Sequence, residues 1–213
     1  MEKMKLHDII VVDNAIETDL ANYFEKECFN DSFPWYVQRD SYVDKDDNTN
    51  QIKAFVNKNS FTTIQLVHGV YYHNDNPQIR STLYNKVLDV MKQAIGKATN
   101  NTFNPVIIRA KINFLLNNTK SSFKEYNTPH VDNLFNNSYS GIYYVNDSDG
   151  DTIVFNEKCD SKFDINNLTI KKRIAPKKNR FVLFDGDYYH TSCNPIHNET
   201  RIVINLNMAN KNE

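Results

Sequence analysis

The 213-residue sequence has few cysteines, little glycine and no long apolar run. Its three cysteines, Cys28, Cys159 and Cys193, are an odd number, lie far apart and form no CxxC pair. This pattern argues against a secreted disulfide scaffold and against a zinc ribbon, and it suits a reducing cytoplasm. No apolar stretch approaches the roughly 20 residues that a membrane helix needs, and the N-terminus has no signal-peptide pattern. We therefore expect a cytoplasmic protein without a membrane partner.

The sequence also lacks an excess of charge of either sign. Its 25 Lys and Arg against 26 Asp and Glu give a formal net charge of −1. Such a balance supplies no global attraction to nucleic acid or to an anionic membrane, and no stripe of aromatic and basic residues compensates for it. Nucleic acid is therefore disfavoured as a partner. A small molecule or a peptide remains as the expected substrate, and the oligomeric state is left open.

Hydrophobic periodicity predicts two helices in the first half of the chain, over residues 18–29 and 77–98. Thr18 is a candidate N-cap for the first helix, and Pro77 fits the first turn of the second. After residue 104 the sequence consists of short apolar runs between turn signals, which is typical of strands. The predicted strands are Val106–Leu116, Ser140–Val145, Thr152–Phe155, Leu168–Ile174, Phe181–Phe184 and Arg201–Met208.

Helices followed by evenly spaced strands predict a mainly β, α+β protein with an antiparallel core and helices against one face. We expect a single domain over residues 1–213. Residues 1–104 would supply supporting helices and strands, and residues 105–208 the β core.

Two of the predicted strands have one apolar and one polar face. In the last strand, Ile202 and its alternate neighbours face one way, whereas Arg201, Asn205 and Asn207 face the other. Strand Val106–Leu116 repeats the pattern, with Arg109, Lys111 and Asn113 on its polar side. The polar faces suit the wall of a wet cavity, and a small barrel with such a cavity is suited to hold a ligand.

The most informative segment is Pro129-His130-Val131-Asp132-Asn133. Residues two apart in extended backbone share a face, so His130 and Asp132 can reach one metal ion. His190, which follows an apolar predicted strand, is placed to supply a third ligand. Two imidazoles and one carboxylate form the facial triad of non-haem Fe(II) oxygenases. Because an HxD tripeptide is common by chance, the interpretation also needs support from the residues downstream.

That support comes from Arg201, which follows His190 across the Asn194-Pro195 turn at the start of the last predicted strand. An antiparallel return would bring Arg201 into the same cavity, where its guanidinium could grip a carboxylate with two hydrogen bonds. The alternative is a surface ion pair with Glu199. The polar face that Arg201 shares with two asparagines favours the cavity.

Taken together, these residues resemble the Fe(II)/2-oxoglutarate-dependent dioxygenase superfamily, in its prolyl-4-hydroxylase-like branch. The HVDN motif at residues 130–133 and the Gly-Ile-Tyr-Tyr-Val-Asn stretch at 141–146 resemble the HVDN and IYYLN stretches of the oxygen-sensing animal prolyl hydroxylases. Residues 149–155 resemble the GGET-and-Phe strand of many relatives, and residues 174–184 the strand pair before the second histidine. The resemblance covers residues 105–208.

The resemblance implies a double-stranded β-helix (jelly-roll) core in which His130, Asp132 and His190 bind iron as the catalytic centre. It also implies that Arg201 binds the distal carboxylate of 2-oxoglutarate and that Tyr144 donates a hydrogen bond to the same carboxylate. From the residues alone, Tyr144 could equally be a half-buried aromatic side chain.

Relatives often carry a tyrosine shortly before the HxD motif that helps to hold the cosubstrate or the substrate. Tyr126 lies near that place but outside the expected register, and Asn113 on the preceding strand is a rival candidate. Both stay open as cofactor-binding residues.

The implied activity is hydroxylation with Fe(II), O2 and 2-oxoglutarate, which is converted to succinate and CO2, with ascorbate as a candidate reductant. A peptidyl proline or a free amino acid is the favoured substrate. One alternative is a non-catalytic jelly-roll binding module, which would have no need of the HxD, His and Arg set. Another is a cupin-like metalloenzyme, which would use more histidines and leave Arg201 and Tyr144 without a purpose.

Overall fold

The structure is a computed structural model that describes residues 6, 8–38, 64–73, 76–117, 126–132, 138–159, 164 and 167–210. The described helices are α1 (Thr18–Cys28) and α3 (Tyr84–Thr99). The described strands are β1 (Ile10–Asp13), β2 (Tyr36–Gln38), β3 (Gln65–His73), β4 (Pro77–Ile79), β5 (Val106–Leu116), β6 (Tyr139–Tyr144), β7 (Thr152–Lys158), β8 (Ile170–Ile174), β9 (Arg180–Asp185), β10 (Tyr188–Ser192) and β11 (Thr200–Ala209). No helix in these ranges is long and apolar enough to cross a membrane.

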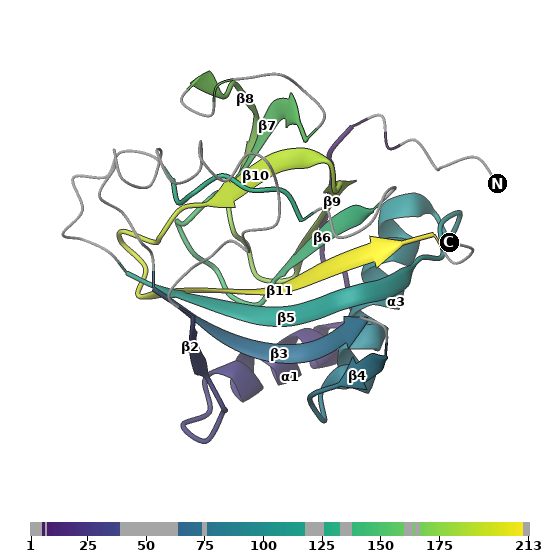
Figure 1. Ribbon diagram of the computed structural model, residues 1–213. Helices are drawn as coiled ribbons and strands as arrows, with labels where there is room; N and C mark the ends of the chain where they lie inside the picture. Colours follow the sequence, from purple (N-terminus) through teal and green to yellow (C-terminus); the bar gives the residue numbers. More distant parts are fainter. Residues whose placement is uncertain are drawn as a thin grey trace.

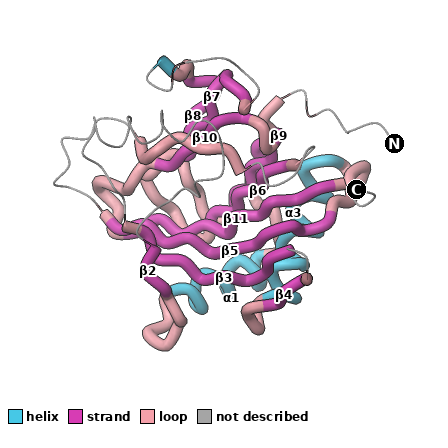
Figure 2. The backbone as a smooth tube through the Cα atoms, in the orientation of Figure 1, coloured by secondary structure: helices cyan, strands magenta, loops and turns pink. Residues whose placement is uncertain are grey.

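The strands form two antiparallel sheets (Figures 1 and 2). The larger sheet has the order β1-β9-β6-β11-β5-β3-β2, with β4 paired to β3, and the smaller has the order β10-β7-β8. From β6 to β11 the chain passes from the larger sheet to the smaller and back, twice. This winding is that of a double-stranded β-helix, or jelly roll, and the predicted mainly β class with supporting helices is confirmed.

The two helices pack on the face of the larger sheet that points away from the smaller one (Figure 1). The apolar side chains of β11 lie there, in one core with the buried stripe of α3. Each of these side chains is less than 5% exposed: Val87, Val90, Met91, Ala94, Ile95, Ile202, Ile204, Leu206 and Met208. The predicted two-faced character of the last strand is thus confirmed, and its polar side faces the space between the sheets.

The predicted cap of the first helix and the predicted start of the second helix were wrong. Thr18 is the first helical residue and not the cap, because the cap position falls on Glu17, whose side chain makes no capping hydrogen bond. Pro77 opens strand β4, where it pairs with His73, and α3 begins only at Tyr84. An edge strand tolerates a residue without an N–H donor, so this proline suits β4 as well as a helix start. Ile79 is accordingly exposed and lies outside the stripe of α3.

The strands predicted after residue 104 are all present, with ends displaced by up to three residues. Strand β10 was not predicted, because its sequence Tyr-Tyr-His-Thr-Ser lacks alternation of apolar and polar residues. Asn133, the last residue of the HVDN motif, lies outside the described residues.

A cluster of charges fastens β1 to the edge of the larger sheet. Asp13 is paired with Arg180 in the register of β1 and β9. Its carboxylate accepts hydrogen bonds from Arg180 Nε at 2.7 Å, Arg180 Nη2 at 3.1 Å and Lys177 Nζ at 3.1 Å. Hydrogen bonds from Arg180, assisted by Lys177, lower the pKa of Asp13 to about 2.

We predict that Asp13→Asn removes a pH-dependent part of the stability. Because the folded pKa lies below the ordinary value of 3.8, the unfolded chain takes up the proton first. The stabilisation is therefore present above about pH 4 and is lost as the pH falls towards 2. Asp13 is 38% exposed, so we expect at most about 1 kcal/mol at pH 6. Urea unfolding of both proteins should show a difference at pH 6 that closes near pH 2. The exposed Asp31→Asn serves as the control, and a difference that persists at pH 2 would contradict the prediction.

Candidate metal centre

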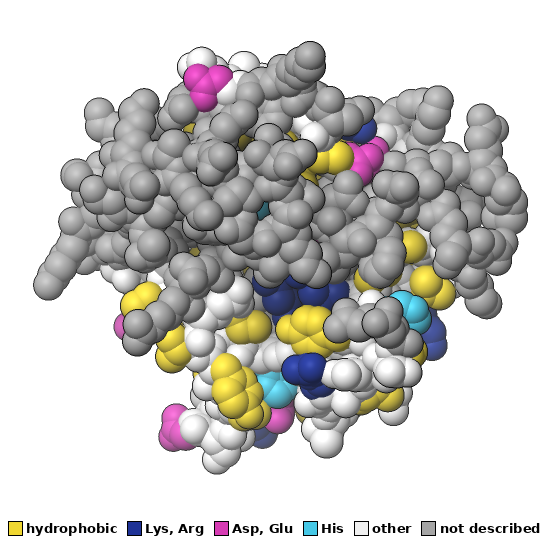
Figure 3. Space-filling view, viewed as in Figure 1, with side chains coloured by type: hydrophobic (Ala, Val, Ile, Leu, Met, Phe, Trp, Pro, Cys, Tyr) yellow, Lys and Arg dark blue, Asp and Glu magenta, His cyan; other side chains and the backbone are white. Residues whose placement is uncertain are grey.

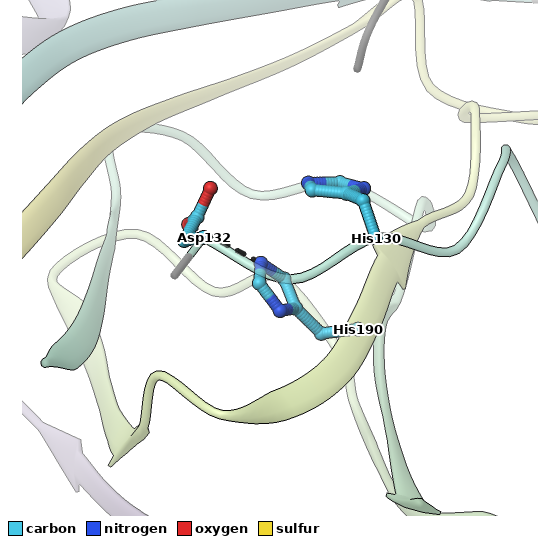
Figure 4. Close-up of side chains that lie close together, drawn as sticks. All are labelled: His130, Asp132 and His190. Carbon is cyan, nitrogen blue, oxygen red and sulfur yellow. Dashed lines mark ion pairs between the residues drawn. The ribbon is translucent and has the colours of Figure 1, made fainter. Parts of the chain in front are cut away.

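The centre is built where the segment before residue 133 joins strand β10. His130 and His190 are linked as an isolated antiparallel bridge. The backbone nitrogen of His130 lies 3.0 Å from the carbonyl oxygen of His190, and the reverse distance is 2.9 Å. Residues bridged in this way carry their side chains on the same face, and the two ring centroids are 4.7 Å apart. Asp132, two residues after His130, faces the same space (Figure 4). The candidate ligand atoms of His130, Asp132 and His190 all lie within 4.8 Å of one another.

The two imidazoles are oriented in the same way by the backbone. His130 Nδ1 lies 3.1 Å from the carbonyl oxygen of Thr128, and His190 Nδ1 lies 3.1 Å from that of Tyr188. Because a carbonyl oxygen only accepts hydrogen bonds, each Nδ1 donates its proton there. In the neutral ring the other nitrogen, Nε2, then presents a lone pair. Ligating histidines in metal centres are held by this kind of outer hydrogen bond.

The contact between His190 and Asp132 provides a test of whether a cation fits. His190 Nε2 lies 3.3 Å from Asp132 Oδ2 (Figure 4). If Nδ1 carries the only ring proton, a lone pair and a carboxylate oxygen face one another across this gap, and they repel. A metal ion or a second proton between them would remove the repulsion. Two imidazole nitrogens and a carboxylate oxygen suit Fe(II) among the first-row divalent metals.

Asp132 is 5% exposed and owes its ionisation to a nearby arginine. Arg109 Nη2, on β5, donates to Asp132 Oδ1 over 2.7 Å, and Arg109 Nε donates to Asn207 Oδ1 over 2.7 Å. Burial opposes the charge on Asp132, but Arg109 and then His190 hold the pKa of that carboxyl well below its usual range. Oδ1 is thereby bound to Arg109, whereas Oδ2 faces His190 and accepts long hydrogen bonds from Asn205 Nδ2 at 3.4 Å and Ser140 Oγ at 3.5 Å.

His130 is held in its neutral form. Burial, reinforced by the neighbouring His190, lowers the pKa of His130 to about 4. A metal-binding imidazole must be neutral and a metal-binding carboxylate ionised. Near neutral pH, His130 and Asp132 therefore already have the protonation states that metal binding requires.

A cavity opens beside the two histidines, between the larger and the smaller sheet. It contains about 520 Å³, including the space at its open mouth. Its lining consists of Gln65, Lys111, Asn113, His130, Ile142, Thr152, His190, Thr191, Ser192, Arg201, Val203 and Asn205. The polar faces of β5 and β11 supply much of this wall, as their alternation indicates.

Arg201 is part of that wall and is only 3% exposed. Its Nε donates to the carbonyl oxygen of Gly150 over 2.6 Å, and its Nη2 donates to Thr152 Oγ1 over 2.8 Å. The hydroxyl of Tyr144 donates to the same Thr152 oxygen over 2.6 Å. The guanidinium also lies 5.6 Å from the centre of the Tyr144 ring. Arg201 is thus held rigidly at the cavity and is not a surface partner of Glu199.

The structure separates the remaining candidates. Asn113 lines the cavity, and its Oδ1 is buried without a hydrogen bond to any described residue. Tyr144 is fully buried behind Thr152 and is not among the lining residues. Tyr126 packs edge-on against the ring of Phe155 at 5.3 Å and likewise does not line the cavity.

Sequence reasoning gave no role to Arg109, Lys111 or Thr152. The alternation of β5 does place Arg109 and Lys111 on the polar face, but it cannot show that Arg109 reaches Asp132. Thr152 lies in the segment that resembles the GGET strand, where its hydroxyl connects Tyr144 with Arg201.

Comparison with known proteins agrees with this geometry. The family model described as the 2OG-Fe(II) oxygenase superfamily matches residues 116–209, which include His130, Asp132, His190 and Arg201. No curated protein sequence matches the chain significantly.

Three solved structures share the fold. An oxidoreductase of the 2OG-Fe(II) oxygenase family from Burkholderia pseudomallei is similar with a TM-score of 0.58 at 12% identity, over 95% of this chain and 88% of that one. The α-ketoglutarate-dependent epimerase SnoN from nogalamycin biosynthesis is similar with a TM-score of 0.59 at 7% identity, over 95% of this chain and 78% of that one. A prolyl-4-hydroxylase from Pseudomonas putida is similar with a TM-score of 0.53 at 12% identity, over 97% of this chain and 94% of that one. The matched part of the chain, residues 116–209, is thus similar to the 2OG-Fe(II) oxygenase superfamily, and these solved structures share the fold of the chain.

Proposed function

We propose that the protein is an Fe(II)- and 2-oxoglutarate-dependent oxygenase that hydroxylates a small molecule or a peptide. The observation that carries the proposal is the buried triad, in which His130, Asp132 and His190 bring their donor atoms within 4.8 Å of one another. Iron bound there would supply O2 activation coupled to the conversion of 2-oxoglutarate to succinate and CO2. Ascorbate would serve as the reductant that keeps the iron ferrous.

The chain's own residues would bind and orient the reactants. Arg201 would hold the distal carboxylate of 2-oxoglutarate, since its guanidinium is fixed at the cavity wall by Gly150 and Thr152. Tyr144, bonded to the same Thr152, would lend its hydroxyl to that carboxylate. Arg109 would hold Asp132 by one oxygen and leave the other for the metal.

The resemblance of the HVDN region to the prolyl hydroxylases supports a peptidyl proline or an amino acid as substrate. The N-terminal strands β1 and β3 belong to the same sheet as β11, which supports one oxygenase domain over residues 1–213. A non-catalytic jelly-roll binding module would leave the oriented histidines without a purpose. Aerobic formation of succinate from 2-oxoglutarate by the iron-loaded protein is the deciding test, and its absence would refute the proposal.

We predict that His190→Ala abolishes iron binding and succinate formation together. Removal of a direct ligand should cost more than the roughly 10–100-fold in metal affinity that is usual for outer hydrogen-bond partners. The matched control is His197→Ala, an exposed histidine in the turn after β10. Titration with Fe(II) under anaerobic conditions and a succinate assay would measure both effects. Retained turnover in His190→Ala would remove this residue from the centre.

We predict that Arg201→Met weakens 2-oxoglutarate binding without loss of iron. Charge-assisted hydrogen bonds contribute about 1.5–3 kcal/mol, which corresponds to roughly 10–150-fold in affinity. Arg173→Met is the control, because that side chain is 43% exposed, pairs with Asp151 and is not among the lining residues. The dissociation constant of 2-oxoglutarate from the Mn(II)-loaded protein would be compared among the three proteins. An unchanged constant in Arg201→Met would contradict the assignment.

We predict that Arg109→Met lowers iron affinity by about 10–100-fold, because Asp132 loses the 2.7 Å hydrogen bond that orients it. Arg109→Lys, which keeps the charge, should recover part of the affinity. Iron titration would be paired with thermal unfolding of the metal-free proteins to separate orientation from folding. Tighter iron binding by Arg109→Met would mean that charge repulsion by Arg109 outweighs its orienting effect.

A further inference from the structure

Lys111 is a second cation in the cavity, and the proposed function gives it no task. It lies in the middle of β5, directly opposite Asn205 of β11 on one side and Gly69 of β3 on the other. Its side chain faces the cavity, which it lines together with His130 and Arg201. Figure 3 shows Lys and Arg side chains gathered over the centre of β5 on this face of the molecule.

The charge of Lys111 is not balanced by the described residues around it. Within those ranges, no hydrogen bond or ion pair reaches its ammonium group. The nearby carboxylate of Asp132 is bound to Arg109 at 2.7 Å and lies against His190 on its other side. Burial and the neighbouring charge of Arg109 lower the pKa of Lys111 to about 8, although Asp132 opposes the shift. An anion placed beside Lys111 would balance its charge and raise this pKa again.

The register indicates that this anion is not the distal end of the cosubstrate. Arg201 is paired with Leu115, whereas Lys111 is paired with Asn205. At about 3.3 Å rise per residue, these two pairs lie roughly 13 Å apart along the sheet. In the proposed function, 2-oxoglutarate extends from the metal to Arg201. Lys111 then remains for a different negatively charged group.

Two asparagines beside Lys111 add hydrogen-bond acceptors to the same place. Asn205 lies opposite Lys111, and Asn113 lies two residues along β5 on the same face. The Oδ1 atoms of both are buried and have no hydrogen-bond partner among the described residues. Buried polar atoms are rarely left unpaired in folded proteins, so a ligand that donates hydrogen bonds is expected there.

We propose, building on the oxygenase function above, that Lys111, Asn113 and Asn205 form the substrate subsite and that the substrate is a free amino acid. Its carboxylate pairs with Lys111, and its ammonium group donates to the two asparagine oxygens. An internal peptidyl proline offers neither a free carboxylate nor an N–H donor on its own ring nitrogen. The subsite therefore distinguishes between the two substrates that the sequence favours, and it gives Asn113 a role with the substrate and not with the cosubstrate.

The first test separates this subsite from the cosubstrate site. The dissociation constant of 2-oxoglutarate from the Mn(II)-loaded protein would be measured for wild type, Lys111→Met and Arg201→Met. We expect a change of less than about threefold in Lys111→Met, against the roughly 10–150-fold loss set out for Arg201→Met. A loss in Lys111→Met as large as that in Arg201→Met would make Lys111 a cosubstrate ligand and overturn the proposal.

The second test uses the iron-loaded enzyme and a panel of the L-amino acids, their carboxamides and a blocked proline-containing peptide. The readout is the stimulation of CO2 release from 2-oxoglutarate over the basal rate without substrate. At least one free amino acid should stimulate release and its carboxamide should not. Lys111→Met should raise the KM for that amino acid at least about 10-fold, as loss of a charge-assisted bond does. In Lys111→Arg, which keeps the positive charge, the KM should rise less. Lys97→Met, on α3, should have the KM of the wild type.

The other possible outcomes of the second test also decide whether the proposed substrate subsite exists. Stimulation by the carboxamide or by the blocked peptide as strong as that by the free acid would overturn the proposal, as would a panel in which no free amino acid stimulates release. The basal rate and iron binding of the wild type report on the oxygenase function itself. If both are present while the panel fails, only the substrate subsite is refuted. If both are absent, the oxygenase function fails first.

Discussion

The centre depends on one pair of backbone hydrogen bonds, between His130 and His190. These bonds join a short segment after β5 to a strand of the smaller sheet, and they fix which faces of the two histidines meet. A shift of one residue in this register would turn one imidazole away from the other. The carbonyls two residues earlier then set the tilt of each ring. Backbone geometry thus determines the arrangement of the side chains before any ligand is present.

The cavity wall combines this fixed centre with an unusual charge balance. Its described lining residues include Lys111 and Arg201 and no Asp or Glu. The carboxylate of Asp132 lies against this wall and is already paired with Arg109. Such a surface favours anionic ligands over cationic or neutral ones, because a buried charge is costly unless an opposite charge lies close to it. A dicarboxylate cosubstrate fits this balance.

Much of this architecture could be predicted from the residues, and the exceptions have physical causes. The middle of β5 and most of β11 alternate between apolar and polar side chains, so their faces could be predicted, and with them the cavity. Pro77 was misplaced because proline is favourable both at a helix start and in an edge strand, and only tertiary pairing decides between them. The contact of Arg109 with Asp132 joins distant parts of the chain, and local patterns carry no information about such a pairing. The same holds for Thr152, whose role arises only when β7 lies beside Tyr144 and Arg201.

The hydroxyl of Thr152 has a consequence for how tightly a carboxylate can be held. It accepts from both Tyr144 and Arg201, so the phenolic proton of Tyr144 is already engaged at 2.6 Å. An arriving carboxylate must draw that proton away from a neutral oxygen before it gains the bond. Charged acceptors form hydrogen bonds roughly twice as strong as neutral ones. The net gain is therefore only the difference between the new bond to the carboxylate and the lost bond to Thr152. The threonine therefore keeps the tyrosine and the guanidinium in place while the pocket is empty, at the expense of some affinity when it fills.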